Sequence, residues 1–574
     1  MPPTPLTLST LSQPASTPGA LDRIARILVG GVLVGLIAAC GNGGGGGDGG
    51  DGGGNPGGGG GGGPGQSGRL EFFQASLHAV DPSDPETILT IDANASELAD
   101  GENDVGAVAF FGGTLQGGGV SDLAVEFVVY ARADGTLQRV STDATNGVPV
   151  PQRLSSETNA LPLCDVRVGF DLADADNARF VYGSDRTVAG DCSGALTWRA
   201  VTLSDDAATD PVDFPGEPIE ALFDPIDGSH TGWLSQSGGV LQRLAPDLSV
   251  QADNLFDVQS GAESLGFIGN GSVFLEIDNG LFAFDPATDT LIDFLFTFAQ
   301  LCPCTLTFST DQDFAYFLDS DELVRADATT ANVASLDAPM DVLGFTPGFL
   351  SFVAVGTNHV AWSYLSDADG NPVTVDDQAV IVRSVAKDGS GAVDLDVLSS
   401  SIGPLAFFST FLSANGGEWV FYDSQIELSP SLFQPVSVAA RLDGTNLLRF
   451  PESLWIGSSF STEFLGSQMG ITDRIIRLDG VADLANLGAG TLSLSSFDAS
   501  DPTAPPTDLG MLPSDTEFVF FLPGFGPARI GFMVSIDGFG NGQSDILFID
   551  TETPNSLRRL TDTDGISEFP APGF

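Results

Sequence analysis

Positive charge is scarce in this chain of 574 residues. Lysine and arginine together number 21 against 76 aspartates and glutamates, which gives a formal net charge of −55, and Lys387 is the only lysine. Such an excess of negative charge repels phosphate backbones, and no basic patch offsets it, so nucleic acid is not expected as a partner. The same carboxylates favour solubility, and they also offer sites for divalent cations.

The motifs of several enzyme classes are missing as well. The sequence has no G-x-S-x-G nucleophile elbow, no Walker loop and no H-E-x-x-H helix. Its three histidines, His78, His230 and His359, lie far apart, although a ring-shaped fold can bring two of them together at its centre. Carboxylates are so abundant that sequence does not single out a pair for glycoside hydrolysis, and no catalytic residue is assigned.

Long helical periodicity is lacking after residue 69. Only 17% of residues are charged, while 42% are apolar and 72 are glycine. Helices with charged outer faces need more charge than this, whereas short, closely packed strands joined by tight turns do not. We therefore expect an all-β domain over residues 69–574.

One apolar run stands out near the N-terminus: residues 27–39, ILVGGVLVGLIAA, which follow Arg23 and Arg26 and precede Cys40. The run is shorter than the ~20 residues needed to span a bilayer but suits the core of a signal peptide. Its end, IAAC, resembles the signal of bacterial lipoproteins, in which an aliphatic and two small residues precede the cysteine to be lipidated. The resemblance implies a signal peptide over residues 1–39 and a lipid anchor at Cys40. The alternative is a signal-anchor helix with an incidental cysteine.

The segment after Cys40 is almost pure glycine. It has few side chains to bury, so it cannot offset the entropy of ordering, and residues 40–68 are expected to form a lipidated, disordered tether. As a flexible coil this tether reaches roughly 30 Å, and at full stretch on the order of 90 Å. Gly41 and Asn42 lack the aspartate associated with inner-membrane retention, which favours the outer membrane of the cell envelope as the place of anchoring.

Residues 69–574 repeat one unit: a short apolar strand, a turn rich in Asp, Gly, Thr and Asn, and a second apolar strand. Asp-Gly and Asp-x-x-Thr turns supply the left-handed or side-chain-bonded backbone that a tight hairpin needs. The clearest examples are 127–140, 231–244, 281–294, 380–395, 437–450 and 546–560. Several units are preceded by a further apolar piece, as at 308–319, 412–423 and 532–550.

The spacing of these hairpins is typical of a repeat architecture. Hairpin starts recur at intervals of roughly 35 to 65 residues, around the ~40–50 residues of a propeller blade. With the stretch DILFIDTETPNSLRRLT at 545–561, the units resemble the blades of TolB-like and WD40-like β-propellers, although regular Trp-Asp pairs are missing. The resemblance implies a β-propeller of about eight blades, within a range of seven to nine, in which residues 69–77 complete the last blade. The alternative is a pair of tandem β-sandwich domains, because hairpin patterning alone does not separate the two folds.

Four cysteines remain after Cys40, an even number that favours disulfides in an exported chain. Cys164 with Cys192 would close a loop across one blade. Cys302 and Cys304, two positions apart, can form a strained disulfide or, alternatively, a redox or metal site. No histidine or further cysteine pair accompanies them at zinc spacing, so the disulfide interpretation is preferred.

The best candidate for a cation site is the segment DADGNPVTVDD, which begins at Asp367. Asp367, Asp369 and Asn371 present hard oxygen atoms at alternate positions, as calcium loops do, and Asp376 follows. The segment lacks the glutamate and the flanking helices of an EF-hand, and ordinary turn chemistry accounts for it without a metal. A weaker acidic cluster lies at 171–177. Calcium is the one cofactor that the sequence suggests.

These observations leave three functional hypotheses. The first is a lipid-anchored protein of the cell envelope whose propeller is a scaffold for a protein or glycan partner, and the tether and the missing catalytic signature favour it. The second is a carboxylate-based glycan hydrolase or lyase with its site in the propeller channel. The third is a calcium-stabilised surface adhesin. Resemblance of fold alone does not decide among them.

Overall fold

The structure is a computed structural model, and the elements that it describes are all β-strands, which confirms the all-β prediction. The described residues are 71–73, 78–81, 84–92, 107–116, 119–132, 136–141, 144, 147–156, 163–169, 179–184, 196–202, 210–224, 229–267, 271–297, 308–310, 314–319, 322–339, 353–367, 378–399, 411–412, 418–429, 432–465, 468–481, 491–513, 518–523, 530–537 and 543–559. Among these residues no helix is long and apolar enough to cross a membrane.

The strands follow one another along the chain with short connections. The first are β1 (Glu71–Phe73), β2 (His78–Asp81), β3 (Asp84–Thr90), β4 (Ala107–Gln116), β5 (Gly119–Ala131), β6 (Leu137–Ser141), β7 (Gln152–Arg153), β8 (Leu163–Gly169), β9 (Arg179–Ser184), β10 (Thr197–Thr202), β11 (Val212–Asp213), β12 (Glu217–Phe223) and β13 (His230–Ser237). The next are β14 (Val240–Leu244), β15 (Val250–Asp257), β16 (Ala262–Phe267), β17 (Val273–Ile277), β18 (Gly280–Asp285), β19 (Thr290–Thr297), β20 (Phe308–Thr310), β21 (Phe314–Asp319), β22 (Glu322–Asp327), β23 (Asn332–Asp337), β24 (Val353–Val355), β25 (His359–Asp367) and β26 (Gln378–Ala386). The last are β27 (Val393–Ser399), β28 (Phe411–Leu412), β29 (Trp419–Ser429), β30 (Leu432–Arg441), β31 (Leu447–Pro451), β32 (Ser453–Leu465), β33 (Gln468–Asp479), β34 (Ser493–Asp498), β35 (Thr507–Met511), β36 (Phe518–Pro523), β37 (Ile530–Asp537), β38 (Gln543–Asp550) and β39 (Arg558–Arg559).

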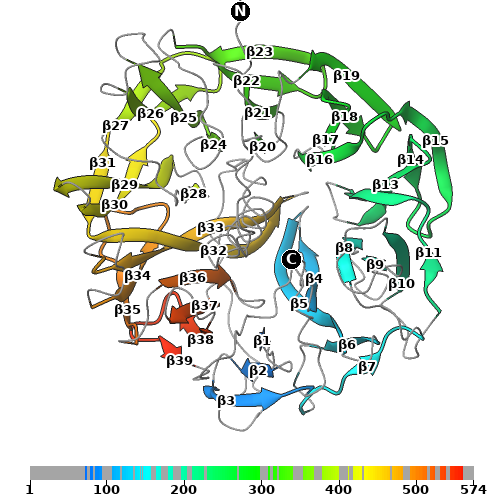
Figure 1. The fold of residues 1–574 in the computed structure, drawn as a ribbon, viewed down its shortest axis with the longest axis horizontal. Helices are drawn as coiled ribbons and strands as arrows, with labels where there is room; N and C mark the ends of the chain where they lie inside the picture. The colour runs from blue at the N-terminus through cyan, green and yellow to red at the C-terminus, as the bar shows by residue number, and fades with distance from the viewer. Residues whose placement is uncertain are drawn as a thin grey trace, which may run out of the picture.

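Nearly every sheet is built from strands that are consecutive in the sequence. Among the described residues, seven separate four-stranded antiparallel sheets comprise β8–β11, β12–β15, β16–β19, β20–β23, β24–β27, β28–β31 and β36–β39. Strands β1–β3 form a three-stranded sheet, and a larger sheet joins the sets β4–β7 and β32–β35. The sheets succeed one another around a ring (Figure 1), with the first strand of each four-stranded sheet towards the centre and the fourth at the rim.

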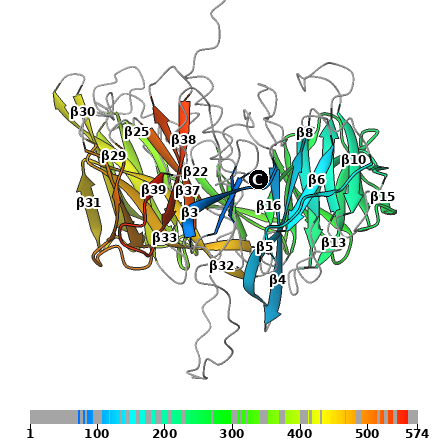
Figure 2. The ribbon, with the colours of Figure 1, turned by 90° about the horizontal axis from the view of Figure 1, so that it is seen from below.

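Two long hairpins meet within this ring. Strands β5 and β32 each span 13 residues, and they pair antiparallel where Val120 faces Phe464. In Figure 1 the β4–β5 and β32–β33 hairpins both reach towards the centre, and in Figure 2 the β4–β5 hairpin extends beyond one face of the ring. The pairing ties an early part of the ring to a part that is late in the sequence.

The six predicted hairpins are confirmed. They are the antiparallel pairs β5–β6, β13–β14, β18–β19, β26–β27, β30–β31 and β38–β39. The Asp443 carboxylate accepts hydrogen bonds from the Thr445 backbone N and Oγ1 at 2.9 and 2.6 Å, so the turn satisfies its own polar groups. Aspartates that bond a hydroxyl in the same way follow the third strand of seven sets: Asp247, Asp285, Asp327, Asp388, Asp443, Asp498 and Asp550.

The apolar core is divided among the junctions between successive sheets. One buried cluster joins the β16–β19 and β20–β23 sheets through side chains such as Phe274 and Phe317. Another joins β24–β27 to β28–β31 through Val382 and Val438, and comparable clusters lie at neighbouring junctions. Because buried apolar surface is worth about 25 cal/mol per Å², each of these sheets is held mainly by its neighbours.

Buried polar groups also join neighbouring sheets. Asp423 on β29 is 3% exposed, and its Oδ1 accepts a hydrogen bond from the Trp455 backbone N on β32 at 3.0 Å. Burial raises the pKa of the Asp423 carboxyl well above its ordinary value. Asp396 on β27 accepts a hydrogen bond from Tyr422 Oη on β29 at 3.1 Å and forms an ion pair with Arg449 on β31. The two carboxyl groups therefore fasten the β28–β31 sheet on both of its sides.

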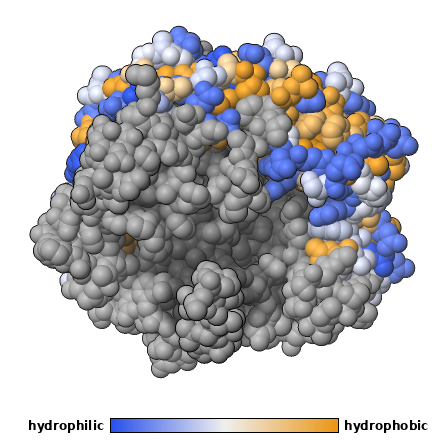
Figure 3. Space-filling view, turned by 45° about the horizontal axis from the view of Figure 1, so that its top comes forward, coloured by the Kyte–Doolittle hydropathy of each residue, from blue (hydrophilic) through white to orange (hydrophobic). Residues whose placement is uncertain are grey.

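Single apolar side chains are exposed around the rim. Each of these outermost strands carries one: Val212, Val250, Leu295, Val397, Leu447 and Met511. On the described part of the face in Figure 3, apolar surface is interspersed with polar surface. Scattered apolar residues are usual on protein surfaces, so this described surface does not form one continuous apolar face.

The expectation that residues 69–77 complete the last sheet is wrong. Strand β1 pairs with β2 instead, and the β36–β39 sheet has four strands of its own. Closing the short β1–β2 loop costs less entropy than pairing with a strand at the other end of the chain. The first sheet is attached to the β4–β7 set by Asp92, whose Oδ2 accepts hydrogen bonds from Tyr130 Oη and Arg132 Nε, each at 2.6 Å.

Candidate functional site

Most of the residues singled out in the sequence lie outside the described part of the chain. They are Cys40, Cys192, Cys302, Cys304, Asp369, Asn371 and Asp376, together with the cluster at 171–177. Cys164 lies on β8 and Asp367 ends β25, but only their backbone is described. Lipidation, the disulfides and calcium binding therefore stay predictions. Among the described residues, no group of three or more His, Cys, Asp or Glu side chains is placed to hold a metal ion.

The three histidines lie in three different sheets. His78 lies on β2, and only its backbone is described. His359 on β25 is half-buried, with its Nδ1 at 2.8 Å from Glu418 Oε2. His230 begins β13 and is buried. The structure therefore does not bring His230 and His359 together, and their surroundings differ.

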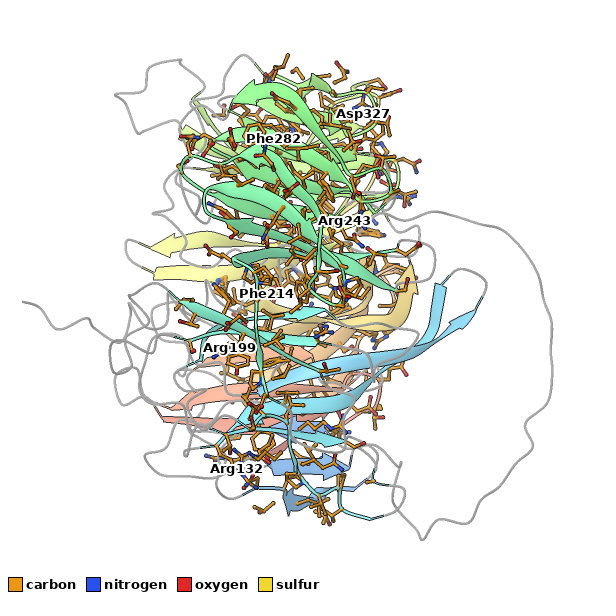
Figure 4. All side chains as sticks on the ribbon, turned by 90° about the vertical axis from the view of Figure 1, so that its right-hand side faces the viewer. Arg132, Arg199, Phe214, Arg243, Phe282 and Asp327 are labelled. Atoms are coloured by element: carbon orange, nitrogen blue, oxygen red, sulfur yellow. The ribbon has the colours of Figure 1, made fainter. Side chains whose placement is uncertain are left out.

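A cleft of about 690 Å³ opens at the junction between the β8–β11 and β12–β15 sheets. It is lined by Leu196, Thr197, Trp198, Asp213, Phe214, Gly216 and Glu217. These residues come from the start of β10, the end of β11 and the start of β12, which lie together because only residues 214–216 connect β11 to β12. In the view of Figure 4, Phe214 lies between Arg199 and Arg243 in the stack of strands.

Aromatic rings and carboxylates share this cleft. Trp198 and Phe214 are 8% and 5% exposed, whereas Asp213 and Glu217 are exposed. Asp213 Oδ1 lies 2.6 Å from Arg199 Nη1 and is thereby ion-paired. With two carboxylates against one guanidinium, the cleft carries net negative charge. Apolar walls with a few polar groups are typical of ligand sites, since the polar groups fix the ligand's orientation.

Gly216 shapes the backbone between the two sheets. Its φ is +84°, and a Cβ at this position would lie 2.3 Å from the backbone O of Gln236. Only glycine adopts this conformation with so close an approach. The residue therefore allows β11 to continue into β12 with a short connection beside the cleft.

Phe214 connects the cleft to a buried aromatic group behind it. The ring centroids of Phe214 and Trp233 are 5.5 Å apart, and those of Trp233 and His230 are 5.1 Å apart, both in edge-to-face geometry. Such geometry is favoured because the positive ring edge meets the negative ring face. His230 and Glu217 lie at opposite ends of the β12–β13 pair. The aromatic contacts therefore run from the cleft to the far end of the junction.

His230 is a buried histidine that is neutral at neutral pH. Burial lowers its pKa to about 4, and the charge of Arg179 on β9 lowers it further, against the opposing effect of a hydrogen bond to the Gly232 backbone. Among the described residues, neither His230 Nε2 nor Trp233 Nε1 has a hydrogen-bond partner. Arg179 is half-buried, and burial lowers its pKa as well. Unpaired buried polar groups cost free energy, so they are worth examining as functional groups.

An irregularity in β13 turns His230 towards Trp233. The register between β12 and β13 shifts at Thr231, which is the extra residue of a β-bulge. In a regular strand positions three apart point to opposite faces, so the bulge is what places both rings on one side. Gly232 permits it, because its φ is +142° and a Cβ there would lie 2.1 Å from the backbone O of Leu244.

A pair of glutamates forms a second polar feature. Glu263 on β16 directly faces Glu276 on β17 in the antiparallel register, and β16 lies at the inner edge of its sheet (Figure 1). Burial and the neighbouring Glu263 charge raise the pKa of Glu276. Two facing carboxylates disfavour double ionisation, so one of them holds a proton more readily than an isolated glutamate does.

Sequence reasoning missed the cleft and the glutamate pair, and it did not distinguish His230 from the other histidines. The sequence HTGW places a glycine inside a strand pattern, which is a signal for a bulge. That signal was available for His230. The glutamate pair depends on the register of the hairpin over 262–277, and the cleft depends on contacts between two sheets, neither of which the sequence reports directly.

Comparison with known proteins gives no family for this chain. No protein-family profile matches it, and no curated protein matches it. Similar solved structures include a eukaryotic initiation factor, at 10% identity over 88% of this chain and 98% of that one, with a TM-score of 0.31. An oligogalacturonate lyase in complex with manganese is 10% identical over 50% of this chain and 72% of that one, with a TM-score of 0.30. A putative TolB from Agrobacterium tumefaciens is 12% identical over 48% of this chain and 78% of that one, with a TM-score of 0.18. At such low TM-scores and identities, the chain is weakly similar to these proteins and the likeness carries no argument about its activity.

Proposed function

We propose that this protein is a lipid-anchored binding scaffold of the bacterial cell envelope, held at the outer membrane through Cys40, with a β-propeller that binds a glycan. Sheets of four consecutive strands arranged around a ring support a propeller over tandem sandwiches, because sandwich strands alternate between two facing sheets. Seven separate four-stranded sheets, with the joined β4–β7 and β32–β35 sets, support a count of seven to nine blades.

The proposed binding site is the cleft between the β8–β11 and β12–β15 sheets. The observation that carries the proposal is the presence of two aromatic rings, Trp198 and Phe214, and two carboxylates, Asp213 and Glu217, in one opening. The rings suit the apolar face of a pyranose, and the carboxylates accept hydrogen bonds from its hydroxyls. Net negative charge at the cleft of a protein with a charge of −55 favours a neutral or amine-bearing glycan over a polyuronate.

Calorimetric titration of the full chain with a neutral and an amine-bearing oligosaccharide, at pH 7.5, tests this proposal. Glu217→Gln keeps the side-chain volume and removes one charge, so its affinity for the amine-bearing ligand is expected to fall about tenfold, as loss of one charge-assisted hydrogen bond implies. Asp253→Asn, which changes an exposed carboxylate of β15 outside the cleft, is the matched control. Absence of binding to either ligand, or equal losses in the two variants, would contradict the proposal.

The Glu263–Glu276 pair favours a second candidate function, carboxylate-based cleavage of a glycan. An acid that holds a proton beside an ionised carboxylate is the arrangement of a general acid and base. Release of new reducing ends from neutral oligosaccharides measures this activity, and Glu276→Gln is expected to abolish it. If the unmodified protein releases none while it binds the same oligosaccharides, the scaffold function stands alone.

The calcium hypothesis stays a proposal of its own. Its residues Asp369, Asn371 and Asp376 lie outside the described part of the chain, so their geometry adds nothing to the sequence argument. A ligand that binds only the folded state raises the melting temperature. A melting temperature that is equal in millimolar calcium and in EDTA would remove calcium stabilisation as a function.

A further inference from the structure

His230 occupies a position that tolerates a neutral imidazole and opposes a charged one. It is 8% exposed, and its Nε2 faces no hydrogen-bond acceptor among the described residues. A proton added to Nε2 would therefore place a buried charge without a partner. Burying such a charge is far more expensive than burying a neutral polar group, so a protonated ring is driven towards water.

The charged groups around the ring do not compensate for a proton. Arg179 on β9 is the cation whose charge acts on the imidazole. Asp247, between β14 and β15, is exposed and bonds Ser249. Arg243 on β14 directs its guanidinium to the next sheet, and Asp224 follows the end of β12. Side chains of β8 are not among those described, so the described surroundings give the imidazolium one cation and no bonded carboxylate.

The contacts of His230 lead to the cleft. Its ring meets Trp233 at 5.1 Å, and Trp233 meets Phe214 at 5.5 Å. Phe214 lines the cleft, and Trp233 belongs to the apolar cluster that joins the β8–β11 and β12–β15 sheets, together with Val181 and Trp198. Displacing the imidazole would therefore disturb the contact between the two sheets and the wall of the cleft at the same time.

We propose that protonation of His230 in mildly acidic solution opens the junction between the β8–β11 and β12–β15 sheets and releases the ligand held in the cleft. The opening is a property of the junction itself, whereas the release rests on the glycan-binding function proposed above. A histidine freed into water titrates near 6.5, and the buried ring resists protonation down to about pH 4. By linkage, lowering the pH from 7.5 to 5.0 raises the opening equilibrium roughly thirty-fold.

Amide hydrogen exchange of the full chain tests the opening without any ligand. After correction for intrinsic exchange rates, peptides of β9 and β13 are expected to lose protection roughly thirty-fold between pH 7.5 and 5.0. Peptides of β25, where His359 has the carboxylate partner Glu418, serve as the internal reference and should keep their protection. Unchanged protection in β9 and β13, or an equal loss in β25, would overturn the proposal.

Two variants at His230 assign the effect to this side chain. His230→Phe keeps an aromatic ring against Trp233 and cannot be protonated, and His230→Gln keeps a polar side chain in case the first variant folds poorly. Either variant is expected to abolish the acid-induced loss in β9 and β13. His359→Gln is the matched control and should retain it. A loss as large in both His230 variants as in the unmodified protein would show that other groups open the junction.

Binding of a neutral oligosaccharide at both pH values tests the release, because the charge of such a ligand does not change with pH. Affinity is expected to fall roughly thirty-fold from pH 7.5 to 5.0 in the unmodified protein and to stay constant in His230→Phe. Absence of binding at pH 7.5 would refute the proposed function while the exchange data still decide the opening. Binding of equal strength at both pH values would refute the release while the binding function stands.

Discussion

Two junctions of this molecule treat buried polar groups in opposite ways. Between the β24–β27 and β28–β31 sheets, Asp396 is 5% exposed, accepts a hydrogen bond from Tyr422 Oη and pairs with Arg449. Between the β8–β11 and β12–β15 sheets, His230 Nε2 and Trp233 Nε1 have no partner among the described residues. Paired buried groups rigidify a junction, whereas unpaired ones weaken it. The comparison indicates that the first junction serves stability and the second retains a polar group at a cost in stability.

The two described histidine side chains repeat this contrast. His359 has Glu418 at 2.8 Å, and the same carboxylate accepts a hydrogen bond from the Asn358 backbone N at 2.6 Å. His230 has aromatic neighbours and the cation Arg179 instead. A carboxylate partner stabilises the charged imidazole, and an apolar site opposes it. The residue type is the same in both places, and the partner decides how each junction responds to acid.

The largest expected effect is at the paired junction. Asp396→Ala leaves the buried Tyr422 hydroxyl without its acceptor and removes the partner of Arg449, so it should lower the free energy of unfolding by roughly 3 kcal/mol. Urea denaturation measures this loss. Asp394→Ala on the same strand breaks the more exposed ion pair with Arg383 and should cost less than about 1 kcal/mol. Equal losses in the two variants would remove the distinction between buried and exposed pairs.

A smaller effect is expected at the bulge of the unpaired junction. Gly232→Ala forces a Cβ to within 2.1 Å of the Leu244 backbone O, so the strand must shift, at a cost of roughly 2 kcal/mol. Gly238→Ala also has a positive φ, of +61°, but meets nothing within 4 Å. This control should therefore cost only about 1 kcal/mol. Thermal unfolding compares them, and a milder effect at Gly232 than at Gly238 would refute the account of the bulge.

The smallest expected effect is a gain in stability at Asp423. Burial raises the pKa of this carboxyl while Ser437 Oγ and the Trp455 backbone N donate to its Oδ1. A raised folded-state pKa contributes stability below the unfolded pKa of about 3.9, and that contribution is lost as the pH rises towards the folded value. Asp423→Asn keeps an acceptor oxygen and cannot ionise, so it should stabilise the protein by about 1 kcal/mol at pH 7.

The gain from Asp423→Asn should shrink as the pH falls towards 4, because the carboxyl of the unmodified protein is then neutral in both states. Denaturation series at several pH values follow this dependence. Asp396→Asn is the comparison, since removing a charge that pairs with Arg449 should destabilise instead. Stabilisation by both substitutions would show that the cation contributes nothing to that junction.

The sequence predicted the elements that depend on neighbouring residues. Turns such as the one at Asp443 are built from side chains two or three positions apart, so the hairpin at 437–450 could be located without knowing its surroundings. The same local logic explains the wrong expectation for residues 69–77, because repeat spacing suggested a distant partner where an adjacent strand was available. Hairpin patterns report local pairing far better than they report which strands meet across a ring.

The candidate site could be predicted much less well. Trp198 and Phe214 are brought to one opening by two sheets, and the orientation of His230 depends on one inserted residue, Thr231. A single extra residue reverses the side to which a strand directs its side chains, and composition carries no trace of that reversal. The residues that matter for chemistry here are set by contacts between sheets.

The division of the apolar core among junctions makes this molecule a chain of links. Because each buried cluster belongs to two adjacent sheets, a change in one sheet is felt mainly by its neighbours. Over evolutionary time a sheet can be duplicated, lost or rewritten while distant links keep their contacts. Such an architecture lets a lineage alter the circumference of the ring, or move a binding cleft from one junction to the next, without redesigning the whole.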